Sequence, residues 1–135
     1  MYQLSTDELM FWDRNTDVLP LYHAFAQKLF ACFPDTSMRV QKTQITYAHR
    51  HVYACVSSAR IKPRTELPAA CFLLTLGLPY PLESPRVALK TEPYPGRWTT
   101  HILIDSETAL DAELFSWLRQ AYDFSLTKAR RGQGR

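Results

Sequence analysis

The chain has 135 residues, of which 46% are hydrophobic and 21% are charged, and its formal net charge is +3. This length allows one domain but excludes two independent cores, and the composition excludes a wholly disordered chain. The positive charge is local, because residues 39–64 hold six basic and no acidic residues and residues 128–135 hold four basic ones. The rest of the chain is acidic, which disfavours a dedicated nucleic-acid-binding domain, since such domains are basic overall.

The first predicted element is a helix that begins at Thr16-Asp17, with Pro20 tolerated in its first turn. Its apolar residues recur at steps of three and four, the spacing of one buried helix face. They are Val18, Leu21, Tyr22, Phe25, Leu29 and Phe33. Pro34 ends the helix, and residues 1–15 are expected to form an N-terminal extension.

Five strands are expected next, because the apolar period changes to two. The first is predicted to run unbroken over residues 38–47, and a turn at 48–50 returns the chain in an antiparallel hairpin over 52–57. The remaining strands are expected at residues 70–76, 86–90 and 98–104, with a proline-containing loop over residues 58–69.

A closing helix is predicted from Asp111, with one apolar stripe that includes Trp117. Residues 126–135 contain little that can pack and are expected to form a basic flexible tail. Short connections favour antiparallel pairing, and helices with one apolar face favour packing on the same side of a sheet. The predicted fold is therefore α+β. It is a two-layer sandwich in which a five-stranded, mainly antiparallel sheet carries an N-terminal and a C-terminal helix on one face, forming a single domain over residues 16–125.

The chain shows no signal-peptide pattern and no apolar run near the ~20 residues that span a bilayer. Its three cysteines, Cys32, Cys55 and Cys71, lack CxxC spacing and lie in apolar runs. They are expected to be buried free thiols, as in a reducing compartment. We therefore expect a cytoplasmic protein without a membrane partner.

Three motifs occur in order between the two predicted helices and at the end of the second: VQKTQITY (40–47), EPYPGRWTTHILI (92–104) and AYDF (121–124). With these motifs the chain resembles the bacterial domain-of-unknown-function family 5655, over about residues 16–125. The resemblance implies a small cytosolic domain, standing alone or joined to others, some of them nuclease-like. The resemblance gives no catalytic residues that could be assigned to positions of this chain.

The first candidate site is the polar interruption formed by Lys42, Thr43, Gln44 and Tyr47. The side of the sheet taken by apolar residues switches between Val40 and Ile45. This switch predicts either a β-bulge near Lys42 or a polar pocket at that point. The alternative is a bulge that only twists an edge strand and leaves Lys42 in solvent.

The second candidate is the pair Arg97 and Trp98, which follows a turn shaped by Pro95 and Gly96. Such a pair can stack on a ring or grip a carboxylate or phosphate. The alternative places Trp98 in the core and pairs Arg97 with Glu92. Our hypothesis is that Lys42, Arg97 and His101 converge on one anion-accepting site.

The histidines His49, His51 and His101 do not make a convincing metal site, because they lack a fixed carboxylate or thiolate partner. No nucleophile–base arrangement and no glycine-rich phosphate loop follows from the spacing. We expect no metal and no cofactor.

These observations favour a non-catalytic binding or accessory domain that accepts a small anionic ligand at Lys42 and Arg97. It would use the open sheet face, where the alternation places Arg39, Gln41, Tyr53, Ser57, Thr75, Thr99 and His101. One alternative is a nucleic-acid-associated accessory module that uses the basic hairpin and tail. A second is a small enzyme centred on Lys42.

Overall fold

The computed structural model describes residues 2–59, 65, 67, 68 and 70–133, with side chains only as far as residue 127 at the C-terminal end. Its helical elements are α1 (Thr6–Phe11), η1 (Thr16–Val18), α2 (Leu19–Cys32), η3 (Glu107–Ala109) and α3 (Ala112–Gln133). Its strands are β1 (Ser37–Val40), β2 (Ile45–His49), β3 (His51–Ser57), β4 (Phe72–Leu78), β5 (Val87–Tyr94) and β6 (Arg97–Ile104). The predicted loop over residues 58–69 lies largely outside the described residues.

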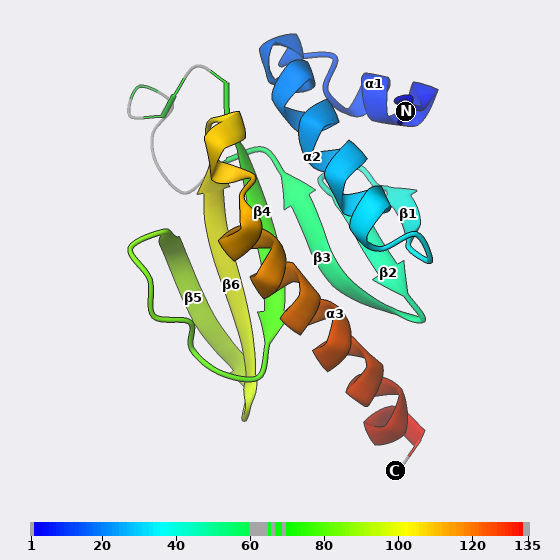
Figure 1. The fold of residues 1–135 in the computed structure, drawn as a ribbon, viewed down its shortest axis with the longest axis vertical. Helices are drawn as coiled ribbons and strands as arrows, with labels where there is room; N and C mark the ends of the chain where they lie inside the picture. Colours follow the sequence, from blue (N-terminus) through cyan, green and yellow to red (C-terminus); the bar gives the residue numbers. More distant parts are fainter. Residues whose placement is uncertain (1, 60–64, 66, 69, 134–135) are drawn as a thin grey trace.

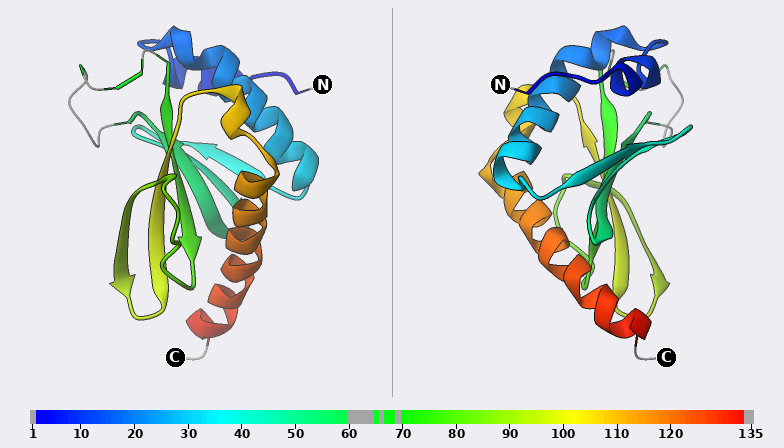
Figure 2. Two further views of the ribbon diagram at one scale, coloured as in Figure 1. Left: turned by 60° about the vertical axis from the view of Figure 1, so that its left-hand side comes forward. Right: turned by 90° about the vertical axis from the view of Figure 1, so that its right-hand side faces the viewer.

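The strands form one sheet in the order β1-β2-β3-β4-β6-β5, and every neighbouring pair is antiparallel. The two long helices lie on one face of this sheet, α2 over the β1–β2 side and α3 across β3 and β4 (Figures 1 and 2). The predicted α+β architecture is confirmed, with an antiparallel sheet and helices towards both ends of the chain. Within the described residues, no helix is both long and apolar enough to cross a membrane.

The sheet has six strands rather than five, because the strand predicted over residues 38–47 is a hairpin. The Gln41 amide donates to the Gln44 carbonyl oxygen at 2.8 Å, and Val40 pairs with Ile45. Lys42 and Thr43 form the tip of this turn. The switch of faces between Val40 and Ile45 therefore comes from a chain reversal, and the predicted bulge near Lys42 is wrong.

A register shift occurs instead between β2 and β3. Tyr47 pairs with Ala54, but Ala48 pairs with Val52, which leaves Tyr53 as the extra residue. A bulge of this kind redirects a side chain. Tyr53 is buried and packs against Phe33 at a ring separation of 5.7 Å, so its predicted place on the open face is wrong.

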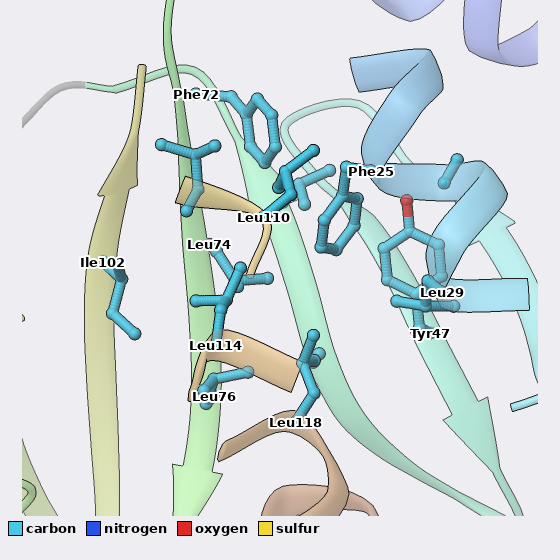
Figure 3. Packing of buried hydrophobic residues seen from close by; sticks show 14 of the residues in the cluster. Phe25, Leu29, Tyr47, Phe72, Leu74, Leu76, Ile102, Leu110, Leu114 and Leu118 are labelled. Atoms are coloured by element: carbon cyan, nitrogen blue, oxygen red, sulfur yellow. The ribbon is translucent and has the colours of Figure 1, made fainter. Parts of the chain in front are cut away.

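The core lies between the helix pair and the facing side of the sheet (Figure 3). Phe25 and Leu29 of α2 and Leu118 of α3 are fully buried there, beside Leu74 and Ile102 of the central strands. Burying such side chains supplies most of the free energy that favours folding. The predicted burial of Trp117 is confirmed, since its exposed fraction is 7%.

The segment before α2, predicted to be an extension, is part of this packing. Ser5 and Glu8 form a reciprocal capping box at the start of α1, a pattern that satisfies two free backbone N–H groups. The Glu8 side chain is fully buried, and so is Trp12, which packs against the Tyr22 and Phe72 rings.

Helix α3 begins where the sequence predicts, because the Asp111 carboxylate accepts a hydrogen bond from the Leu114 amide at 3.0 Å. The helix continues to Gln133, over most of the segment predicted to be a tail. The three cysteines are free, but only Cys71 is buried. Cys55 is half-buried and Cys32 is exposed, so the prediction of three buried thiols is wrong for these two.

Candidate binding groove

A groove of about 1160 Å³ lies beside the open face of the sheet. One wall is formed by Asp7 and residues 10–15, which belong to α1 and to the segment between α1 and η1. A second wall is the β1–β2 turn, residues 40–44. The floor is formed by five residues from the ends and outer faces of the central strands and β5. They are Ser57, Ser58, Leu73, Leu89 and His101. We call this feature the groove below.

Strand alternation explains the floor. Cys55 pairs with Thr75, Thr75 pairs with His101, and His101 pairs with Leu89, so these four side chains form one row across the sheet. Their neighbours Leu74 and Ile102 are buried on the helix side. Because successive side chains point to opposite faces, the row must lie on the open face.

One hydrogen bond lies within this row, and two more connect the row to the β1–β2 turn. The Thr75 hydroxyl lies 2.8 Å from His101 Nδ1. The Cys55 thiol donates to Gln44 Oε1 at 3.6 Å, and Gln44 Nε2 donates to Gln41 Oε1 at 3.3 Å. Burial lowers the pKa of His101 and raises the pKa of the Cys55 thiol. The imidazole and the thiol are therefore both uncharged near neutral pH.

Four charged side chains line the groove, Arg14 and Lys42 on one hand and Asp7 and Asp13 on the other. All four are exposed, and none forms an ion pair with another residue in the described part of the chain. The ion pairs that do occur there involve Arg86, Lys90 and Arg119. The two cations of the groove are therefore available to a ligand.

The structure brings some of the predicted site residues together. Lys42, Thr43, Gln44 and His101 all line the groove. Tyr47 does not, because it is buried on the helix side and its hydroxyl lies 2.8 Å from that of Tyr22. Strand alternation agrees with this result, because Gln44 and Tyr47 are three residues apart and so fall on opposite faces.

Arg97 and Trp98 lie elsewhere and are not among the lining residues of the groove. They begin β6, next to the β5–β6 hairpin, at the end of the sheet opposite the β1–β2 turn (Figure 1). Glu92 accepts a hydrogen bond from the Gly96 amide at 3.0 Å, and Gly96 has the left-handed φ of 75° that favours glycine. The structure thus does not bring Arg97 to Lys42.

The histidines also lie apart. His49 stacks on Tyr122 at the β2–β3 hairpin, with ring centroids 5.4 Å apart, whereas His101 lies in the groove. Within the described residues, no three His, Cys, Asp or Glu side chains form a group suited to a metal ion.

Several residues of the groove were not predicted, among them Arg14, Asp13 and Leu73. Residues 7–15 have no strand or helix pattern that places them beside the sheet. The polar residues Cys55 and Thr75, which alternate with buried apolar ones, were a usable signal for the floor, but sequence alone does not set the register between β3, β4 and β6.

The Thr75 hydroxyl and the His101 imidazole do not by themselves make a nucleophile–base site in the groove. A hydroxyl beside an imidazole is the first requirement of a nucleophile–base pair. Thr75, however, is not among the lining residues, and burial makes His101 a weaker base than usual. The Thr75 hydroxyl therefore serves to orient the His101 ring.

The family model described as Domain of unknown function (DUF5655) matches residues 9–125. No curated protein and no solved structure is significantly similar to the chain.

Proposed function

The chain belongs to the family Domain of unknown function (DUF5655), whose description states no activity, and we propose that it is a binding domain for a small anionic ligand. The observation that carries the proposal is the groove, which collects Lys42, Arg14 and His101 from three separate parts of the chain. Each of these side chains can donate hydrogen bonds to an anion.

The charges of the groove restrict the ligand. Lys42 and Arg14 attract an anionic group, and neither has a carboxylate partner among the described residues. Asp7 and Asp13 line the same groove and repel further negative charge. This balance favours a ligand with one compact anionic group over a polyanion.

The apolar part of the floor supports a ligand with an apolar body. Leu89 is 48% exposed on the open face, and the largely buried Leu73 also lines the groove. Small-molecule sites commonly combine apolar walls with a few polar groups that fix orientation. An aromatic or aliphatic monocarboxylate meets both requirements.

The nucleic-acid alternative is a weaker fit to the groove, because a phosphate backbone would bring successive negative charges past Asp7 and Asp13. We also propose a cytoplasmic location, which three free cysteines support, since thiols persist in a reducing compartment.

Amide chemical-shift mapping by NMR tests the function, with benzoate and inorganic phosphate as probes. We expect shifts confined to residues 13–15, 41–44 and 101, and a loss of roughly tenfold or more in affinity for Lys42→Gln. Binding should also weaken with added salt, since the contact is partly exposed.

Arg97→Gln is the matched control, because it removes an equal charge at the other end of the sheet. This variant should bind both anions as the wild type does. Equal affinities for the wild type and Lys42→Gln would overturn the proposal, and so would shifts centred on the β5–β6 hairpin. A single-stranded oligonucleotide that bound more tightly than either anion at physiological salt would favour the nucleic-acid alternative.

A further inference from the structure

Hydrogen bonds between side chains border the groove, and the direction of each bond decides which groups are left to contact a ligand. His101 Nδ1 has the Thr75 hydroxyl at 2.8 Å, and the other ring nitrogen, Nε2, makes no hydrogen bond within the described part of the chain. His101 itself lines the groove. What the ring offers to a ligand therefore depends on which nitrogen carries the proton.

The Thr75 hydroxyl has a single proton and two neighbours that could accept it, His101 Nδ1 and the Cys55 sulfur. An imidazole nitrogen is a strong acceptor, whereas a thiol sulfur is a weak one. Donation to Nδ1 is therefore the stronger of the two bonds open to this proton. When the hydroxyl donates there, the proton of the neutral ring resides on Nε2, and His101 offers an N–H donor and no acceptor.

The bonds from Cys55 to the turn also leave a donor group free. The Cys55 thiol donates to Gln44 Oε1, which leaves the Gln44 amide group to donate to Gln41 Oε1. The Gln41 side-chain oxygen thereby accepts one hydrogen bond, and the Gln41 NH₂ group remains as a donor. Gln41 and Gln44 both line the groove.

We propose that Thr75 and His101 form a specificity-determining pair in which Thr75 fixes the Nε2–H tautomer of His101. With the Gln41 NH₂ group, this pair places two hydrogen-bond donors on one side of the groove. The inference rests on the proposed function, and it narrows the ligand to one with acceptor atoms on that side, such as a carboxylate or phosphate oxygen. A ligand that donates there would leave two donors facing each other, which is costly in a half-buried site.

The tautomer can be measured without any ligand. Long-range ¹H–¹⁵N NMR of the ¹⁵N-histidine-labelled protein, recorded at pH 8, should show a protonated Nε2 and an unprotonated Nδ1 for His101. Thr75→Val should raise the fraction of the Nδ1–H tautomer. Thr99→Val is the matched control, because Thr99 lies on the same strand face as His101 but pairs with Gly77 and Thr91. An Nδ1–H tautomer in the wild type would overturn the proposal.

Binding of benzoate supplies the second readout. His101→Leu removes the donor and should weaken benzoate binding about tenfold or more, as expected for a hydrogen bond to a charged group. His101→Gln, which can place an amide N–H in the same region, should recover part of that loss. If His101→Leu binds benzoate as well as the wild type does, this inference fails and the proposed function stands. If the wild type binds neither benzoate nor inorganic phosphate, both fail.

Discussion

The Tyr22 hydroxyl of α2 donates a hydrogen bond to the buried carboxylate of Glu8 in α1. The Tyr2 hydroxyl reaches the same carboxylate at 2.7 Å, and the Ser5 amide donates to it at 2.8 Å. Burial and the neighbouring carboxylate raise the pKa of Tyr22, so its hydroxyl keeps its proton and remains a donor. Glu8 thereby connects α1 to the main core. The residues that follow α1 form a wall of the groove.

The first prediction concerns this connection of α1 to the core. Glu8→Ala should lower the free energy of unfolding by on the order of 3 kcal/mol, because a buried donor left unpaired costs about 1–3 kcal/mol. Urea denaturation measures the loss. Asp7→Ala on the same helix is the control, since Asp7 is exposed and its loss should change stability by no more than about 0.5 kcal/mol. Similar values for the two variants would show that the Glu8 contacts do not stabilise the fold.

The second prediction concerns the packing of α3. Trp117 is 7% exposed, and the Arg86 guanidinium lies 5.3 Å from the centroid of its ring. Trp117→Ala should cost roughly 3–5 kcal/mol of unfolding free energy, the usual range for removing a large core aromatic. Trp117→Phe keeps most of the apolar area and should cost clearly less. A loss below about 1 kcal/mol for the alanine variant would contradict the core described above.

The third prediction concerns the start of α3. The pKa of Asp111 is lowered, first by the Leu114 amide that it caps and then by Arg86, whose Nη1 lies 3.0 Å from its carboxylate. Because the folded-state pKa lies below the ordinary value, the carboxylate favours folding above that value, and this contribution is lost as the pH falls through the folded pKa.

An NMR titration of the Asp111 carboxyl carbon measures this directly. The apparent pKa should lie below the ordinary value near 3.9 and should rise in Arg86→Gln, yet stay depressed while the Leu114 amide still donates. An Asp111 pKa unaffected by Arg86→Gln would show that the pair has no energetic role.

The helices and the antiparallel sheet could be predicted because their signals are local. Phe25 and Leu29 are four residues apart on one helix face, and Asp111 caps its helix three residues before Leu114. Such patterns reflect the helical period and the free amides of a helix start, and neither depends on the rest of the chain.

The β1–β2 turn is a feature that such local patterns could not predict. A bulge and a chain reversal both change which face the next apolar residue takes, so alternation alone cannot distinguish them. Lys42 and Thr43 at the tip are not the glycine, proline, asparagine or aspartate that usually mark a turn. The strand count and the place of Tyr53 were both missed for reasons of this kind.

The α1 wall of the groove was missed for a different reason. A glutamate in an acidic N-terminal segment indicates a solvated side chain, since buried glutamates are rare. Glu8 is buried because tyrosines 14 residues further along and six residues back supply its hydrogen bonds. Sequence patterns contain no information on such long-range pairing.

The last prediction concerns the pH dependence of stability. Burial lowers the pKa of His101 below its ordinary value near 6.5, because the charged imidazolium is poorly solvated on the floor of the groove. As the pH falls from 7.5 to 5.5, the unfolded chain therefore takes up a proton at this residue before the folded protein does. The contribution of His101 to stability must then fall over this interval, since stability rises with pH wherever the unfolded state binds more protons. Urea denaturation at the two pH values should show a smaller loss for His101→Gln than for the wild type.

His23, His49, His51 and the carboxylates are common to both proteins, so their contributions cancel in the difference. An equal loss in the two proteins would mean that His101 is as well solvated in the groove as in the unfolded chain.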